Sequence, residues 1–138
     1  MASASASIEL AVPADVAWRR IGGFDALPDW LPFITRSVLS EGGRVRHLTT
    51  ADGATIVERL MTYDEAGRSY SYHILEAPFP QTAYLSTLRA VPIGPERCRV
   101  DWLGGFSPEG VSEAEISQLF EGIYEQGLQG LVPQFPVA

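Results

Sequence analysis

The clearest hydrophobic pattern in the sequence lies near the C-terminal end. Apolar residues recur there at intervals of three or four positions: Ile116, Leu119, Phe120, Ile123, Gly127 and Leu131. This spacing places them on one face of an α-helix. Ser112 and Glu115 form a capping-box pair just before this stretch, and Val111 and Ile116 have the spacing of a hydrophobic staple. The pattern predicts a helix that begins at Ser112, ends before Pro133 and buries one face.

The middle of the chain, from Phe33 to Phe106, has the pattern of strands separated by turns. The turn signals are rich in Gly, Pro, Asp and Glu: Glu41-Gly42-Gly43, Asp52-Gly53, Asp64 to Gly67, Pro78-Phe79-Pro80 and Gly94-Pro95. Such residues are typical of hairpin connections. They divide this part of the chain into six consecutive strands joined by hairpins.

The N-terminal part predicts one strand and two short helical segments. The strand covers residues 7–12, and Pro13 suits the first turn of a helix that ends at Gly22-Gly23. A shorter helical or turn segment covers residues 24–30. The alternating Ala and Ser residues before Ser7 are expected to fray in part. The whole order predicts an α+β fold of one domain, residues 1–138, with the helices on one side of the sheet.

Alternation within the predicted strands indicates which side chains face the interior. Between residues 97 and 106 the even positions are apolar, whereas the odd positions up to 101 are charged, so the even positions face inward. The same parity over residues 70–74 and 56–60 gives apolar inward faces, but it also turns Glu58 inward. A buried carboxylate without a partner costs several kcal/mol. We therefore expect a cation or water beside Glu58.

Arg46 is a candidate partner for Glu58, but the register of its hairpin is open. A two-residue turn at Asp52-Gly53 pairs position 46 with Arg59, on the same face. A loop longer by one residue pairs Arg46 with Glu58 instead. The residues alone leave both registers open, and with them the choice between a structural ion pair and a ligand contact for Glu58 and Arg46.

The other side chains with possible chemistry are few. Tyr72 and Tyr84 combine an apolar ring with a hydroxyl group, which suits the wall of a cavity, and Trp30 and Trp102 are interpreted as packing residues. His47 and His73 are expected on the outer surface, with no carboxylate at metal-ligand spacing. No nucleophile motif and no glycine-rich phosphate loop is present. No metal and no cofactor is therefore expected.

Composition and charge exclude other classes of protein. The 138 residues include 10 basic residues, all of them arginine, and 17 acidic ones, giving a net charge of −7. A nucleic-acid-binding surface needs concentrated positive charge, so nucleic acid is not an expected partner. The apolar runs are shorter than the ~18 residues of a membrane span. With the single cysteine Cys98 no intrachain disulfide can form, and a cytoplasmic location is expected.

Several segments together resemble a known family: Trp30-Leu-Pro-Phe33, Arg46 before the Asp52-Gly53 turn, Val57-Glu-Arg-Leu60 with Asp64, Tyr70-Ser-Tyr72, Tyr84 and Leu128-Gln-Gly-Leu131. They resemble the START-like, helix-grip superfamily called SRPBCC, in its bacterial polyketide cyclase/dehydrase-like branch, and more distantly the plant abscisic-acid receptors. The similarity covers residues 7–131. It implies a helix-grip fold, in which a curved seven-stranded antiparallel sheet wraps around the long C-terminal helix, with two short helices between strands one and two.

The resemblance also implies a cavity between sheet and helix. The residues that it places there as ligand-binding are Arg46, Ile56, Glu58, Tyr72, Ile74, Phe79, Tyr84, Ser86, Leu119, Ile123 and Gly127. The loops at residues 50–54 and 79–81 would form its mouth, which favours the longer hairpin loop. Where the receptors hold a ligand carboxylate with a lysine, this chain has Leu31, and the closing loop is shorter here, so a carboxylate ligand held by an ammonium group is not expected.

Three functions remain open from the sequence. The first is the binding of a small, largely apolar molecule (aromatic, polyketide or lipid-like), with Glu58, Arg46 and Tyr72 at its polar end. The second is an enzyme of the cyclase, dehydratase or isomerase type, in which Glu58 acts as catalytic acid or base. The third is a protein-interaction role with a vestigial cavity. The sequence leaves open whether the chain is a monomer or a homodimer.

Overall fold

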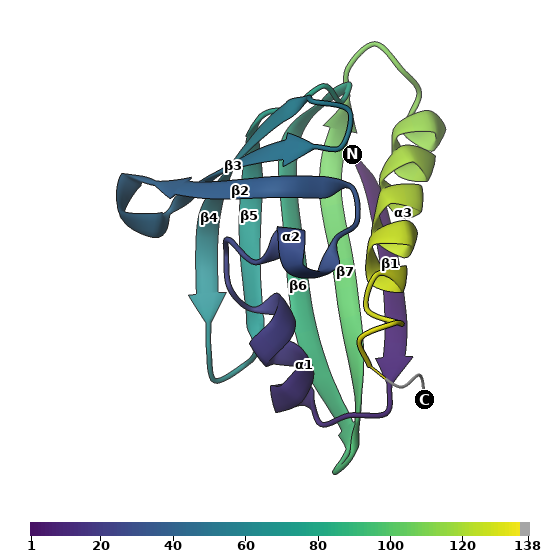
Figure 1. Ribbon diagram of the computed structural model, residues 1–138. Helices are drawn as coiled ribbons and strands as arrows, with labels where there is room; N and C mark the ends of the chain where they lie inside the picture. Colours follow the sequence, from purple (N-terminus) through teal and green to yellow (C-terminus); the bar gives the residue numbers. More distant parts are fainter. Residues whose placement is uncertain (136–138) are drawn as a thin grey trace.

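The protein is a curved antiparallel sheet with one long helix lying along it (Figure 1). The computed structural model describes residues 1–135. Its elements follow in chain order: β1 (Ala2–Leu10), α1 (Ala14–Ile21), α2 (Leu27–Trp30), β2 (Ile34–Ser40), η1 (Glu41–Gly43), β3 (Val45–Thr50), β4 (Thr55–Asp64), β5 (Ser69–Glu76), β6 (Gln81–Gly94), β7 (Arg97–Pro108) and α3 (Glu113–Gln129).

The seven strands lie in the order β1-β7-β6-β5-β4-β3-β2. Each strand from β2 to β7 pairs with its neighbour in sequence, and β1 closes the sheet beside β7. Helices α1 and α2 carry the chain from β1 to β2, which form the two edges of the sheet. The predicted α+β helix-grip fold is therefore confirmed, including its six consecutive strands and its two short helices.

The first strand is longer than the sequence analysis predicts. It begins at Ala2 rather than at Ser7, and Ala2 pairs with Phe106 of β7. Alanine occupies the positions on the face that α3 covers, and Ala2 and Ala4 are buried there. Their small side chains let the helix lie close to the strand, while the ladder to β7 satisfies the backbone groups. The expected fraying of this segment was wrong for that reason.

Helix α3 begins where the capping box predicts. The hydroxyl of Ser112 accepts a hydrogen bond from the backbone N–H of Glu115, with the two atoms 3.1 Å apart. The buried face of the helix repeats mainly every four residues: Ile116, Phe120, Tyr124, Gly127 and Leu128. Leu119 lies outside this face and is 38% exposed. Within residues 1–135, no helix is long and apolar enough to cross a membrane.

Gly127 allows α3 to approach the sheet and α2 closely. A Cβ atom at this position would lie 2.6 Å from Cδ1 of Leu31 and 2.7 Å from Cζ3 of Trp102. We expect Gly127→Ala to lower the free energy of unfolding by about 1–2 kcal/mol, because the strain of overpacking exceeds the gain in helix propensity. Urea unfolding of the purified variant measures this change.

Gly122, in the same helix, provides the matched control. A Cβ atom there would have no heavy atom within 4 Å, so Gly122→Ala gains helix propensity without a clash. We expect it to raise the free energy of unfolding by about 0.5–1 kcal/mol. If both variants change stability in the same direction, the close packing at Gly127 does not have the role assigned to it.

Candidate functional site

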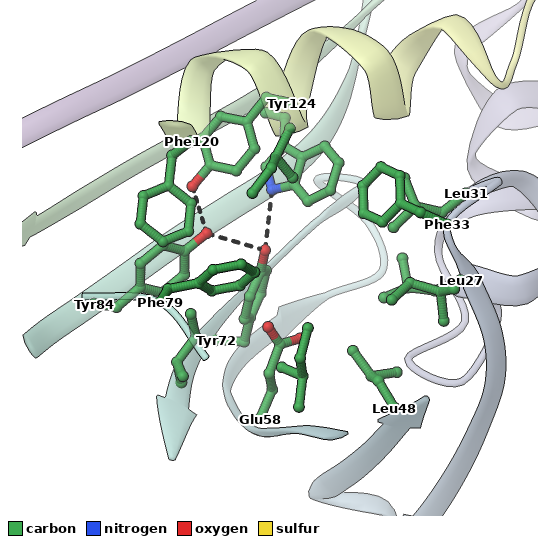
Figure 2. Close-up of a pocket in the computed structure, with 15 residues that line it drawn as sticks. Leu27, Leu31, Phe33, Leu48, Glu58, Tyr72, Phe79, Tyr84, Phe120 and Tyr124 are labelled. Carbon is green, nitrogen blue, oxygen red and sulfur yellow. Dashed lines mark hydrogen bonds between the residues drawn. The ribbon is translucent and has the colours of Figure 1, made fainter. Parts of the chain in front are cut away.

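Two neighbouring compartments lie between the concave face of the sheet and the side of α3, and Figure 2 shows the residues that line the inner one. The inner compartment has about 40 Å³ of space that the centre of a water molecule can reach, so it is large enough to hold water or a small chemical group. Its wall comes from both layers: Leu27, Leu31, Phe33, Ile34, Leu48, Ile56, Glu58, Tyr72, Ile74, Phe79, Tyr84, Trp102, Phe120, Ile123 and Tyr124.

The outer compartment is wider and opens to solvent. On the same measure it has a volume of about 350 Å³. Four side chains belong to both walls and mark the junction of the compartments: Phe33, Ile56, Phe79 and Ile123. The remaining wall comes from Thr50, Ala51, Asp52, Ala54, Pro78 and Gln126. The two segments expected at the mouth, residues 50–54 and the segment that begins at Phe79, thus lie at the outer compartment.

The longer of the two hairpin registers brings Arg46 and Glu58 together. Arg46 on β3 pairs directly with Glu58 on β4, and both side chains are buried. Nη2 of Arg46 lies 2.7 Å from Oε1 of Glu58, and Nε donates a hydrogen bond of 2.8 Å to the same oxygen. Glu58 is therefore part of a buried ion pair, as the sequence analysis allowed.

The rest of the Arg46 guanidinium group is held within the protein. Nη1 donates hydrogen bonds of 3.1 Å to the carbonyl oxygen of Phe24 and to the hydroxyl of Tyr70. The guanidinium carbon lies 4.2 Å from the centre of the Phe24 ring and 4.6 Å from that of Tyr72, which are cation–π distances. Arg46 does not line either compartment. The expected place of Arg46 in the cavity wall is therefore not where the structure has it, because these partners surround it, and its contact with a ligand stays a prediction.

Glu58 keeps one oxygen available toward the inner compartment. Among residues 1–135, its hydrogen-bond partner is Arg46, and both the hydrogen bond from Nε and the close contact with Nη2 are made by Oε1. Oε2 therefore has no partner in this part of the chain, and Glu58 lines the compartment (Figure 2). Burial raises the pKa of Glu58 above its ordinary value, and the charge of Arg46 offsets part of that rise.

Three tyrosine hydroxyls form a network in the wall of the inner compartment, and Tyr72 is the one next to Glu58 (Figure 2). Nε1 of Trp102 donates to the hydroxyl of Tyr72 at 3.0 Å, and that hydroxyl lies 3.4 Å from the hydroxyl of Tyr84. Tyr84 is hydrogen-bonded to Tyr124 on α3, which donates a 3.3 Å bond to Ser86. The network thus ties the helix to three strands of the sheet.

These tyrosines act as hydrogen-bonding groups and keep their protons. Burial raises the pKa of Tyr72 and of Tyr84 well above the ordinary value, and the charge of Glu58 adds to both shifts. Burial also raises the pKa of Tyr124 to about 12. The hydroxyl groups are therefore neutral at physiological pH, when they can donate a hydrogen bond to a ligand.

Most side chains expected in the cavity wall are in it. The seven that line the inner compartment are Ile56, Glu58, Tyr72, Ile74, Phe79, Tyr84 and Ile123. Their contact with a ligand remains a prediction. Leu119 was wrongly placed, because it faces outward from α3. Gly127 and Ser86 are also absent from the wall, since Gly127 is packed against Leu31 and Trp102 and Ser86 is buried behind the tyrosines.

The sequence analysis missed several side chains of the wall. Phe120 and Tyr124 line it from α3, and Trp102, interpreted as a packing residue, lines it from β7. The four-residue spacing of Ile116, Phe120 and Tyr124 was the available signal. Leu31 and other residues around α2 close the remaining side of the compartment. Strand alternation could not have identified them, because they lie outside the alternating strand segments.

The two histidines lie outside this site. Nδ1 of His73 is 2.7 Å from the carbonyl oxygen of Tyr84, and Nε2 of His47 is 2.8 Å from the hydroxyl of Ser40. In residues 1–135, no three His, Cys, Asp or Glu side chains are close enough together to hold a metal ion. The polar groups of the inner compartment are a carboxylate, hydroxyls and an indole N–H.

The family relationship follows from the sequence as a whole. Residues 1–135 match the model of the family described as polyketide cyclase/dehydrase and lipid transport. The chain belongs to this family. The expected membership is therefore confirmed. No curated protein matches the chain in sequence.

Solved structures support the same relationship. The protein XoxI from Bacillus cereus is 46% identical, with a TM-score of 0.95 over 98% of this chain and 96% of that one. A START superfamily protein from Mycobacterium smegmatis is 16% identical, with a TM-score of 0.78 over 96% and 95% of the two chains. The Zhui aromatase/cyclase from a Streptomyces species is 18% identical, with a TM-score of 0.75 over 95% and 88%. The last two show a common fold.

Proposed function

We propose that this family member is a single ligand-binding domain that encloses a small, largely apolar molecule. The observation that carries the proposal is the cavity between sheet and helix, whose wall is mainly apolar and contains a few fixed polar groups. Such a wall is typical of small-molecule sites, and the outer compartment, about 350 Å³, falls within their usual range. The description of the family, which includes lipid transport, supports the same reading.

A proton-transfer enzyme is the second candidate. Oε2 of Glu58 faces the inner compartment, and burial raises the pKa of this carboxyl, as a general base requires. The family description also includes cyclase and dehydrase activities. The close ion pair with Arg46 opposes this role, because it stabilises the carboxylate and holds it in one place. Binding is therefore the function that the geometry supports best.

A bulky side chain at the junction of the compartments tests the proposal. Ile123 lies on α3 in both walls, so Ile123→Trp is expected to obstruct the passage between them. We expect the affinity for the neutral fluorescent probe N-phenyl-1-naphthylamine to fall at least tenfold. Fluorescence titration of the purified protein measures the dissociation constant, and thermal unfolding checks that the variant is folded.

Leu119→Trp is the matched control, because it places the same side chain one turn away on the exposed face of α3. It is expected to leave probe binding within about twofold of the original chain. Equal binding by all three proteins would show that the probe does not use the cavity. Absence of binding to the original chain would favour the interaction role with a vestigial cavity.

A further inference from the structure

We propose that the ligand is a neutral molecule with an apolar body and a small head group that carries both a hydrogen-bond donor and an acceptor, as a carboxamide does. The head group occupies the inner compartment, where Glu58 accepts its donor and Tyr72 donates to its acceptor. The same arrangement excludes carboxylates. This inference rests on the proposed binding function and names the class of molecule that the site selects.

The sizes of the two compartments set the shape of the ligand. The inner one, about 40 Å³ on the same measure, is small and suits a compact head group. The outer one, about 350 Å³, is large enough for a ring system. The junction is lined by Phe33, Ile56, Phe79 and Ile123. A polar group is therefore best placed at the inner end and an apolar body outside it.

The acceptor at the inner end is Oε2 of Glu58. The other oxygen of this carboxylate accepts the hydrogen bond from Nε of Arg46 and contacts its Nη2, so the pair is fixed. Oε2 has no hydrogen-bond partner within residues 1–135 and is not fully enclosed by protein atoms, so a ligand O–H or N–H group in the compartment can donate to it. The ion pair thus orients an acceptor without placing the guanidinium group in the cavity wall.

The donor beside it is the hydroxyl of Tyr72. Tyr72 on β5 lies diagonally across from Glu58 on β4, on the same face of the sheet (Figure 2). Its oxygen accepts from Trp102, and the hydroxyls of Tyr84, at 3.4 Å, and of Ser86 lie beside it. Because Tyr124 donates to Ser86, Tyr84 donates to Tyr124 and the hydrogen of Tyr72 points toward Tyr84. A 3.4 Å separation is longer than an ordinary O–H···O bond, so a ligand carbonyl at ordinary distance would be a better acceptor for this hydrogen.

The charges of the cavity exclude an anionic head group. None of the residues that line either compartment is Arg, Lys or His, whereas Glu58 lies in the inner wall and Asp52 in the outer one. A carboxylate entering the inner compartment would lose its hydration, meet the charge of Glu58 and gain no cation. Because Arg46 already compensates Glu58, a neutral head group leaves the charges of the site balanced.

Three naphthalene derivatives of the same size test this inference at neutral pH. They are 2-naphthamide, with donor and acceptor; 2-naphthoate, which is ionised; and 2-isopropylnaphthalene, without a polar group. Displacement of N-phenyl-1-naphthylamine gives their affinities. We expect 2-naphthamide to bind at least tenfold more tightly than either of the others. Equal or tighter binding of 2-naphthoate or 2-isopropylnaphthalene would overturn the inference, while binding of the ring itself would leave the proposed function standing.

Tyr72→Phe removes the donor while keeping the ring, and the indole of Trp102 retains its 3.1 Å bond to Ser86. We expect this variant to bind 2-naphthamide about fivefold to tenfold more weakly and 2-isopropylnaphthalene unchanged. Tyr63→Phe, at an exposed tyrosine outside the cavity, is the control and should bind both as the original chain does. An equal loss for both compounds in Tyr72→Phe would also overturn the inference. If no derivative and no probe binds to the original chain, the proposed function itself fails.

Discussion

Replacement of Arg46 by methionine is expected to lower the free energy of unfolding by about 3–5 kcal/mol. The substitution leaves Glu58 buried without its ion pair and the hydrogen bond from Nε of Arg46, and it also deprives the carbonyl of Phe24 and the hydroxyl of Tyr70 of their donor. Methionine fills much of the space of the arginine side chain, so the loss reflects charge and hydrogen bonding more than volume. Urea unfolding followed by circular dichroism measures the change.

The double variant Arg46→Met with Glu58→Met separates the cost of an unpaired charge from other effects. When both members of a buried ion pair are replaced by apolar residues, stability is often restored or even increased. We expect the double variant to recover most of the stability lost in Arg46→Met. A double variant as unstable as the single one would mean that the guanidinium contacts with Phe24 and Tyr70 dominate, rather than the pair with Glu58.

Phe120→Ala is expected to have an effect of similar size, about 3–5 kcal/mol. The ring of Phe120 is buried at the centre of an aromatic cluster, with its centroid 4.7 Å from that of Phe106, 4.9 Å from that of Tyr84 and 5.3 Å from that of Phe79. The truncation removes these contacts and extends the inner compartment by an apolar space. Thermal and urea unfolding report the loss of stability.

A second measurement on Phe120→Ala distinguishes an open space from a collapsed one. An apolar space of this kind stays dry and can accept a small aromatic compound, so we expect benzene to raise the melting temperature of the variant more than that of the original chain. Leu119→Ala, on the exposed side of the same helix, should change stability by no more than about 0.5 kcal/mol. An equal response to benzene in all three proteins would contradict the enlarged compartment.

The order of the elements could be predicted because it depends on local signals. Turn residues separate the strands, alternation reports one buried face, and the capping box at Ser112 marks the start of α3. The extent of β1 could not be predicted in this way. Its alternating Ala and Ser residues have low strand propensity, and they form a strand because β7 and α3 lie beside them.

The site was predictable only in part, for a related reason. The parity of the strands places Glu58 and Tyr72 toward the interior, the family resemblance adds Tyr84, and the structure has all three in the wall. The environment of Arg46 depends on Phe24 and Tyr70, which come from distant parts of the chain, so no local pattern shows that its donors are already used.

The missed residues on α3 have a different origin. Both Ile123 and Tyr124 fall near the boundary of the buried face, and a helix stripe defined from the sequence can be rotated by one residue. The rotation moved Leu119 into the expected wall and left Tyr124 out of it. The four-residue repeat through Ile116, Phe120 and Tyr124 would have corrected this.

The position of the small inner compartment behind the larger outer one also determines how a ligand enters and leaves this site. A ligand of the proposed kind must enter with its polar head group first, and it must leave with its apolar body first. While the ligand is bound, its apolar body lies in the outer compartment, whose wall includes Thr50, Pro78 and Gln126. A second protein could therefore contact the bound ligand, or modify its outer rings, without separation of the sheet and α3.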